Sequence, residues 1–288
     1  MRITLLGILS AIAFCLASFS AQAVITCTAP LSTGFSTAYN PTGPVPNVTQ
    51  GTVSFTCTRS AAGDATALLL RANNGVDVCA GSNDASSGTN CINYEAYQNS
   101  GCSTVWSNNS NASSIPITLL SVLTPQPMTI NFWGCITVAG QNKPAGTYID
   151  TVTISVRTTG GTLIAGASNT MPVSITNPAT CSITSIGNVA FGTYIAFRAT
   201  ALSAPTANIV LSCTSQLPYT MSLDANTGVV AGLNYSLTIN SLTPPVTSRG
   251  TGPGQTHSLV GTMPANQAGT CGTGTCAGTN THTLTVTY

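Results

Sequence analysis

The strongest constraint on the fold of this chain is a two-residue alternation of apolar and polar side chains. Residues 52–56, 151–156 and 283–288 show it clearly, with valine, isoleucine, phenylalanine or leucine between threonines and serines. Successive side chains of a strand point to opposite faces of a sheet, so the pattern is typical of half-buried strands. Clusters of Gly, Pro, Asn and Ser separate these segments. The sequence therefore predicts an all-β fold built from β-sandwiches.

The N-terminal segment indicates export. Arg2 precedes an almost entirely apolar run, residues 3–19, and Ala-Gln-Ala at residues 21–23 has the form of a signal-peptide cleavage site. We expect residues 1–23 to be a signal peptide, with a retained membrane anchor as the alternative. Its removal discards Cys15 and leaves ten of the eleven cysteines. An even number in an exported chain predicts five disulfides in an oxidising compartment.

The balance of charge excludes several classes of partner. The sequence has seven basic and six acidic residues, and the mature chain loses Arg2, so its formal charges cancel. Such a chain has no basic patch to attract nucleic acid or an anionic lipid surface. Hydrophobic residues make up 43% of the sequence, which is enough to build a core. Charged residues are only 5%, so little charge repulsion keeps the exposed strand edges of neighbouring molecules apart.

The sequence repeats itself, which indicates two related domains. Cys27 and Cys57 open the first copy, and Cys181 and Cys213 open the second. Ala-Gly-Thr then precedes the terminal strand of each copy, at residues 145–147 and 277–279. Landmarks in the same order at both ends predict a duplication. We divide the chain into a signal peptide (1–23), an N-terminal domain (24–177) and a C-terminal domain (178–288).

These landmarks resemble those of the spore coat protein U domain family, whose members include subunits of archaic chaperone–usher pili. The second copy shows the resemblance best, through Phe-Gly-x-Tyr at 191–194, the Cys-Thr pair at Cys213 and a strand ending in Tyr288. In the first copy Phe35 and Tyr39 are more widely spaced. The resemblance implies two immunoglobulin-like pilin domains of a type that lacks its last strand, which a neighbouring subunit supplies.

The two copies differ beyond their terminal strands. The first copy continues through Met171, Val173 and Ile175, which alternate with polar residues or proline and form a candidate in-chain completing strand. The second copy has no such segment after residues 283–288. We expect the C-terminal sandwich to lack its last strand and to form a donor-strand acceptor groove, whereas the alternative is that residues 283–288 close a complete sandwich. The expected groove residues are Leu284, Val286, Tyr288 and Val210.

The mature N-terminus predicts the place of the subunit in a polymer. Val24 lies three residues before Cys27, so we expect no N-terminal extension that another subunit could take up. A subunit that accepts a strand without giving one ends a polymer. We therefore expect a two-domain tip adhesin subunit, exported through the periplasm to the cell surface at the pilus tip. The expected partners are a periplasmic pilus chaperone, an outer-membrane usher, a neighbouring pilin subunit and an abiotic or host surface.

Apolar segments of the N-terminal domain are candidates for the adhesive loops, because exposed apolar patches often mark interaction sites. The candidate residues are Ile115, Ile117, Leu119, Leu120, Leu163 and Ile164. The alternative is that these residues belong to core strands. Tyr94, Tyr97 and Trp106 are candidates for stacking on a sugar, with structural packing as the alternative.

The cysteine spacing favours disulfides over a metal site. Cys271 and Cys276 have no further Cys or His at zinc-ligand spacing. The six cysteines of the N-terminal domain allow fifteen connectivities. The pairs we choose are Cys27–Cys57, Cys79–Cys91, Cys102–Cys135, Cys181–Cys213 and Cys271–Cys276.

Signals of catalysis are weak, and we expect no enzymatic activity and no cofactor. A Ser-His-acid triad would need a distant acid such as Asp224 to reach one of the two histidines, His257 or His282, and no Gly-x-Ser-x-Gly motif is present. We interpret His282 as a solvent-facing strand residue in register with Asp150 of the first copy. The alternative functions are a secreted structural coat or matrix protein with two self-contained β-sandwich domains, and a hydrolase or lectin-like carbohydrate module.

Overall fold

Strands, turns and loops make up all of the chain that the structure describes. The computed structural model describes residues 24–41, 43–76, 79, 83–106, 109–272 and 274–288. These residues contain no helix, which confirms the all-β prediction. It follows that none of them belongs to a helix with the length and hydropathy needed to cross a membrane. The signal-peptide prediction for residues 1–23 lies outside the described residues.

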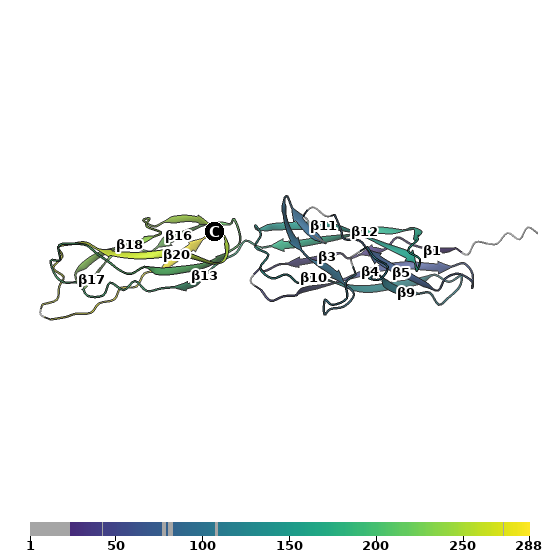
Figure 1. Cartoon of the computed structure of the whole chain (residues 1–288), viewed down its shortest axis with the longest axis horizontal. Helices are drawn as coiled ribbons and strands as arrows, with labels where there is room; N and C mark the ends of the chain where they lie inside the picture. Colours follow the sequence, from purple (N-terminus) through teal and green to yellow (C-terminus); the bar gives the residue numbers. More distant parts are fainter. Residues whose placement is uncertain (1–23, 42, 77–78, 80–82, 107–108, 273) are drawn as a thin grey trace, which may run out of the picture.

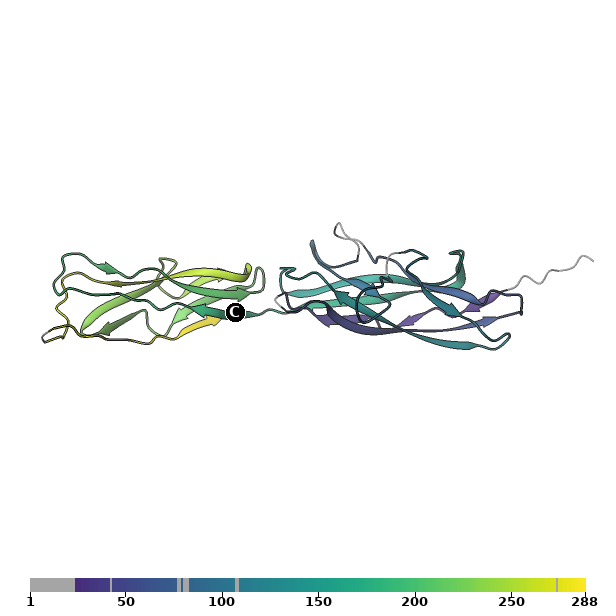
Figure 2. The ribbon, with the colours of Figure 1, turned by 60° about the horizontal axis from the view of Figure 1, so that its bottom comes forward.

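Two β-sandwiches lie end to end along the long axis of the molecule (Figure 1, Figure 2). Each has its own core, one built from buried residues between Phe35 and Ile175 and the other from buried residues between Ala207 and Met263. Only residues 178–180 separate the last strand of the first sandwich from the first strand of the second. The domain division at residue 177 stays a prediction, and the two separate cores are consistent with it.

The N-terminal sandwich packs a five-stranded sheet on a seven-stranded sheet. The first has the order β1 (Ile25–Cys27), β4 (Asn47–Arg59), β10 (Gln126–Ile136), β8 (Glu95–Tyr97), and β2 (Leu31–Ser32) also pairs with β4. The second has the order β3 (Phe35–Ala38), β12 (Leu163–Asn177), β11 (Gly146–Thr158), β5 (Ala67–Ala72), β9 (Ile115–Thr118). It is extended by β6 (Asp84–Ser87), which pairs with β11 and with β7 (Asn90–Asn93).

The C-terminal sandwich packs a six-stranded sheet on a sheet of only three strands. The larger sheet has the order β13 (Cys181–Ile186), β15 (Ala207–Cys213), β20 (Gly252–Met263), β18 (Leu233–Ile239), β17 (Thr227–Val230), and β14 (Leu202–Ser203) also pairs with β20. The smaller has the order β19 (Val246–Arg249), β16 (Pro218–Leu223), β21 (Leu284–Thr287).

Five strand pairings of the first sandwich recur in the second, which indicates one fold in two versions. The pairs β1–β4, β4–β10, β10–β8, β5–β11 and β5–β9 correspond to β13–β15, β15–β20, β20–β18, β16–β21 and β16–β19. Even the register of the first cysteine pair recurs, because Cys27 lies opposite Cys57 and Cys181 lies opposite Cys213.

Ten cysteines form five disulfides, in the same pairs that the sequence analysis chose. They are Cys27–Cys57, Cys79–Cys91, Cys102–Cys135, Cys181–Cys213 and Cys271–Cys276. Three of them close loops with sequence separations of 30 to 33 residues. Closing such a loop stabilises a fold by about 3–4 kcal/mol in the chain-entropy account.

Candidate functional site: an open groove in the C-terminal sandwich

Strand β12 completes the N-terminal sandwich from within the chain. It runs antiparallel to β11 along one side and parallel to β3 along the other. Met171, Val173 and Ile175 point from it into the core, where their side chains are at most 2% exposed. The segment that the sequence analysis selected as a completing strand therefore lies between two strands and covers the core of its own sandwich.

The C-terminal sandwich has no counterpart of β12 among the strands that the structure describes. Strand β21 pairs with β16 on one side, and no described strand pairs with it on the other. Among the strands that the structure describes its last strand is missing, as the sequence predicts. An edge of this kind leaves backbone N–H and C=O groups without strand partners and part of a core uncovered.

Two segments beside this open edge are irregular, although their counterparts in the first sandwich are strands. Residues 191–194 correspond to β3 through the shared Phe, and residues 278–283 correspond to the first part of β11 through the shared Ala-Gly-Thr. β3 pairs only with β12, and residues 146–153 of β11 pair with β12 apart from one bridge to β6. The absence of one strand thus explains why both segments are irregular.

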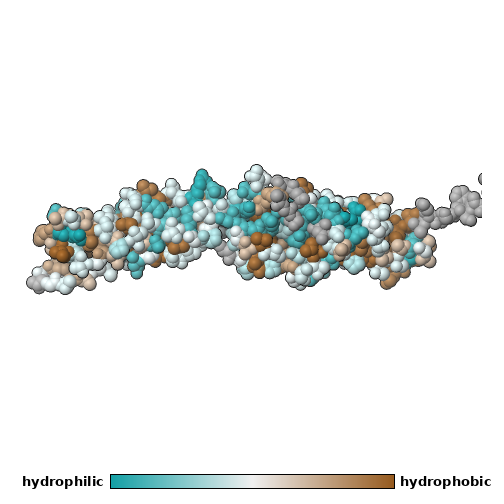
Figure 3. All heavy atoms as spheres, viewed as in Figure 1, coloured by the Kyte–Doolittle hydropathy of each residue, from teal (hydrophilic) through white to brown (hydrophobic). Residues whose placement is uncertain are grey.

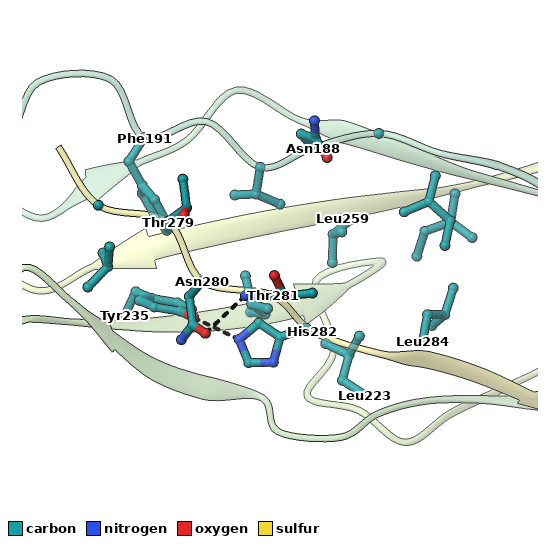
Figure 4. Close-up of a pocket in the computed structure, with 17 residues that line it drawn as sticks. Asn188, Phe191, Leu223, Tyr235, Leu259, Thr279, Asn280, Thr281, His282 and Leu284 are labelled. Carbon is teal, nitrogen blue, oxygen red and sulfur yellow. Dashed lines mark hydrogen bonds between the residues drawn. The ribbon is translucent and has the colours of Figure 1, made fainter.

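A cavity of about 440 Å³ lies between these two segments (Figure 4). Side chains of both sheets line it, so its floor is the uncovered core of the sandwich. Strands β15, β16, β18, β20 and β21 and the irregular segment at 191–194 contribute the main apolar residues, which are Ile209, Leu223, Leu237, Leu259, Leu284 and Phe191.

The ring contacts that build the groove recur in the first sandwich. The ring centroids of Phe35 and Tyr94 are 5.7 Å apart, and those of Phe191 and Tyr235 are 5.6 Å apart. Each phenylalanine also lies over a glycine of the long neighbouring strand, where a Cβ would collide with the ring; these are Gly134 and Gly261. Phe35 is 2% exposed beside β12, whereas Phe191 is only half-buried. The same ring contact is shielded from solvent in the first sandwich and partly exposed to solvent in the second.

A glutamine fixes the same corner of both sandwiches. The backbone N–H of Asn93 donates to Gln141 Oε1 at 2.6 Å, and Gln141 Nε2 donates back to the Asn93 carbonyl at 2.9 Å. Gln267 makes the same pair of bonds with Asn234, at 2.6 and 3.0 Å. The backbone N–H of each glutamine donates to a tyrosine hydroxyl of the segment that carries the phenylalanine, Tyr39 or Tyr194.

These corner residues are not among the residues predicted from the sequence, although the sequence contains a signal for them. Asn-Tyr occurs at residues 93–94 and again at 234–235, and a glutamine follows the next long strand of each copy. The signal is short and the separations differ between copies, so only the fold brings the residues together.

Polar side chains form a chain of contacts across one part of the groove (Figure 4). His282 Nδ1 lies 2.9 Å from Asp224 Oδ1, and His282 Nε2 lies 2.7 Å from the Tyr235 hydroxyl. Asn280 Nδ2 donates to the same hydroxyl at 2.7 Å. The bond from His282 is the main cause that lowers the pKa of the Asp224 carboxyl, with a bond from the Ala225 N–H adding to it.

The first sandwich has an acid where the second has this histidine. Counted from the shared Ala-Gly-Thr, Asp150 corresponds to His282, and the Tyr94 hydroxyl donates to Asp150 Oδ2 at 2.6 Å. Burial raises the pKa of Tyr94, and the Asp150 carboxylate raises it further. A tyrosine of the Asn-Tyr pair therefore contacts this position in both sandwiches.

The interpretation of His282 as a solvent-facing strand residue is wrong. Its side chain is 15% exposed, and it lies just before β21 and faces the groove. It does contact Asp224, as a triad would require, but its other ring nitrogen contacts a tyrosine. His257 is buried between Tyr219 and Asn240. In the described part of the chain, neither imidazole hydrogen-bonds a serine or cysteine side chain.

The predicted groove residues divide into two groups. Leu284 lines the cavity, and Val286 packs partly buried against the same core. Val210 is a wrong choice, because the alternation of β15 turns its neighbours Ile209 and Leu211 inward and Val210 to the other face. Tyr288 lies beyond the end of β21 and is 58% exposed.

Most of the predicted adhesive residues lie in the core instead. Ile117 points into the core from β9 and Ile164 from β12, whereas Ile115 packs partly buried against the same core. Leu119 is buried just after the end of β9. Leu120 and Leu163 are exposed. Two of the three aromatic residues considered for sugar stacking are also buried in the core, namely Tyr94 and Trp106.

Apolar residues are exposed at several places on the surface, and one group lies at the end of the N-terminal sandwich that is remote from the groove (Figure 3). Leu120 and Leu123 are 81% and 74% exposed. The Leu123 N–H donates to the Arg59 carbonyl, and the N–H of the next residue, Ser60, donates to the Val24 carbonyl, which places Val24 near Leu123. The buried Arg59 guanidinium donates to the Leu119 carbonyl and to carbonyls of the 60–66 loop. These exposed residues, Val24, Leu120 and Leu123, are called the end patch below.

Comparison of the sequence with known protein families identifies the family of this chain. The sequence profile of the Spore Coat Protein U domain matches residues 13–155 and 167–241, and the chain belongs to that family. Comparison with curated proteins finds no significant match.

Comparison with solved structures finds matches to two tip adhesins. One is the CsuC–CsuE chaperone–tip adhesion subunit pre-assembly complex of archaic chaperone–usher Csu pili from Acinetobacter baumannii, with 16% identity, 91% of this chain and 100% of that chain covered, and a TM-score of 0.44. Another is the CupB6 tip adhesin from Pseudomonas aeruginosa, with 11% identity, 92% and 95% covered, and a TM-score of 0.39.

Proposed function

We propose that this chain is the two-domain tip adhesin subunit of a chaperone–usher pilus. The C-terminal sandwich accepts a donor strand, first from a periplasmic chaperone and, after passage through an outer-membrane usher, from the next pilin. The N-terminal sandwich binds a surface. One observation carries the proposal: the first sandwich is closed by β12, whereas the duplicate fold of the second leaves the corresponding position as an apolar groove.

The arrangement of the two ends supports this division of roles. The groove belongs to one sandwich, and the end patch lies on the far end of the other (Figure 1). A subunit that attaches through one sandwich leaves the opposite end free for a surface. Exposed apolar side chains that a buried arginine holds in place suit binding to an apolar surface.

Co-expression with a chaperone tests the attachment role. The mature chain would be exported to a bacterial periplasm alone and together with a cognate pilus chaperone. The proposal predicts a complex of one chaperone and one subunit, and a lower yield of the chain, with a C-terminal sandwich of low melting temperature, when the chaperone is absent. A monomer that is obtained in the same yield with and without the chaperone, and that does not bind it, would support the alternative of a secreted coat or matrix protein with two self-contained β-sandwich domains.

Surface binding tests the adhesive role separately. Replacing Leu120 and Leu123 with serine should reduce adhesion to an apolar surface severalfold without lowering the melting temperature, because both side chains are exposed. Leu31→Ser is the matched control, since Leu31 is 67% exposed on β2, outside the end patch. Equal losses in both variants would contradict a specific adhesive end.

A further inference from the structure

The duplication shows how an occupant of the groove would lie, and this inference rests on the proposed function. Counted from the shared Ala-Gly-Thr, Leu284 corresponds to Val152. In the same count His282 corresponds to Asp150, and Asn280 to Tyr148. Strand β12 therefore serves as a template, inside the same molecule, for the segment that the C-terminal sandwich takes up.

The register of β12 assigns one apolar residue to each of three positions. Met171 lies opposite Val152, Val173 opposite Asp150, and Ile175 opposite Tyr148. Directly opposite residues of an antiparallel pair have neighbouring side chains on one face. An occupant in this register places three alternate side chains beside Leu284, His282 and Asn280.

The two sandwiches differ most at the third of these positions. Tyr148 is 1% exposed and fills its end of the core, with its hydroxyl donating to the Pro144 carbonyl at 2.8 Å. Asn280 is much smaller and exposed, and the groove cavity extends past it to Gly278 and Val230. The C-terminal sandwich therefore has more room where β12 places Ile175.

We infer that the groove takes a strand that runs antiparallel to β21 and places a large apolar side chain, larger than isoleucine, beside Asn280. The side chain next to His282 is no larger than valine, and the one next to Leu284 is no larger than methionine. This limit follows because His282 and Leu284 are larger than their counterparts, Asp150 and Val152. The backbone of the occupant pairs on its other side with residues 191–194. The partner is thus a segment with three alternate apolar residues, of which the last along its chain is larger than isoleucine.

Binding of this strand orders both irregular segments. Residues 191–194 and 278–283 gain the partner that β3 and the first part of β11 already have in β12. Gly192 has φ +70°, a conformation outside the strand region, and glycine can leave it without a steric cost. The groove closes by formation of two new strand pairings and not by filling of a rigid slot.

A self-complemented chain tests the preference for a large side chain. Residues 157–177 would be copied directly after Tyr288, which repeats the turn that joins β11 to β12. In three versions the copied Ile175 would be Ile, Phe or Ala. We expect the Phe version to melt about 4 °C above the Ile version in its C-terminal transition, and the Ala version below both. A Phe version that melts below the Ile version overturns the inference.

Asn280→Tyr is the matched variant of the protein itself. It restores the bulk that Tyr148 supplies in the first sandwich, and Asn280 is exposed, so the change is compatible with folding. In this background the order should reverse, with the Ile version melting above the Phe version. An unchanged order would show that the residue beside Asn280 does not set the size preference.

Hydrogen exchange separates this inference from the proposed function. In the self-complemented chain the backbone amides of residues 191–194 and 278–283 should exchange at least about tenfold more slowly than in the original chain. A raised melting temperature without protection of 191–194 overturns the predicted pairing but leaves strand donation intact. A copy that changes neither melting nor exchange contradicts the inference and the proposed function together.

Discussion

The N-terminal and C-terminal sandwiches share five strand pairings, a Phe–Tyr ring contact and a glutamine corner, yet one seals these features and the other leaves them open. At this edge the difference is the strand β12, which has no counterpart among the described strands of the second sandwich. Without a counterpart of β12, Phe191 is half-buried, and two segments beside it lose strand structure. One strand therefore organises its neighbours on both sides as well as covering a core.

Disrupting β12 should remove the closure that distinguishes the two sandwiches. Val173→Asp places a charge beside Asp150 in a position that is 2% exposed. We expect a loss of about 4 kcal/mol or more from the free energy of unfolding of the N-terminal sandwich, because the new carboxylate is buried opposite another carboxylate, Asp150. The C-terminal transition should not move. Calorimetry of the two transitions measures both.

The matched control for this change is Thr176→Asp. Thr176 is exposed on the same strand, so the added charge stays in water. The control should alter stability by less than about 0.5 kcal/mol. A Val173→Asp chain that unfolds like the control would mean that β12 is not part of the N-terminal core.

Replacing each phenylalanine with alanine compares the stability that a buried ring provides with that of a partly exposed ring. Phe35→Ala should cost about 3–5 kcal/mol, as expected for a buried ring, whereas Phe191→Ala in the original chain should cost less than about 2 kcal/mol because its ring is already partly in water. In the self-complemented chain the cost of Phe191→Ala should rise to that of Phe35→Ala. Urea unfolding measures the three values, and a cost for Phe191→Ala that is the same with and without the added strand contradicts the comparison.

Removing the two tyrosine hydroxyls gives a smaller difference. Tyr94→Phe takes a hydrogen bond from a buried carboxylate, Asp150, and should cost about 1.5–3 kcal/mol. Tyr235→Phe acts where Asn280 is exposed and water can replace the lost bond, so we expect less than about 1 kcal/mol. Thermal unfolding of each sandwich measures the pair, and equal costs would argue that the groove is already sealed.

The pH dependence should also separate the sandwiches, by the smallest amount. Burial lowers the pKa of His257, and both histidines of the chain lie in the C-terminal sandwich. The unfolded chain binds a proton below about pH 6.5 while the folded His257 does not, so the stability that neutral His257 provides is complete above that pH and declines as the pH falls toward its lowered pKa.

Unfolding measured between pH 7.5 and 5.5 checks this sign. The C-terminal transition should fall with acid while the N-terminal one stays nearly constant. His257→Gln keeps a polar side chain between Tyr219 and Asn240 and should flatten the C-terminal response. A response that persists in His257→Gln would assign the pH dependence to another group.

Local pattern predicted the strands, the duplication and the missing strand, because these follow from alternation and from repeated landmarks. It did not predict that residues 278–283 are irregular, because the corresponding residues 146–151 of the first sandwich form a strand that pairs with β12. Nor could it separate Leu119 from Leu120, which are adjacent and apolar but point to the core and to water. The groove position of His282 depends on Tyr235 and Asp224, which are distant in sequence.

The most direct test of the missing-strand account compares the original chain with the self-complemented chain by calorimetry. We predict two transitions in each, with the C-terminal one raised by 10 °C or more, roughly the effect of 2 kcal/mol on a domain of this size, and the N-terminal one unchanged. Uptake of the chaperone strand should be lost at the same time. If the copied residues 157–177 leave the C-terminal transition where it is, that sandwich is already complete and the account is contradicted.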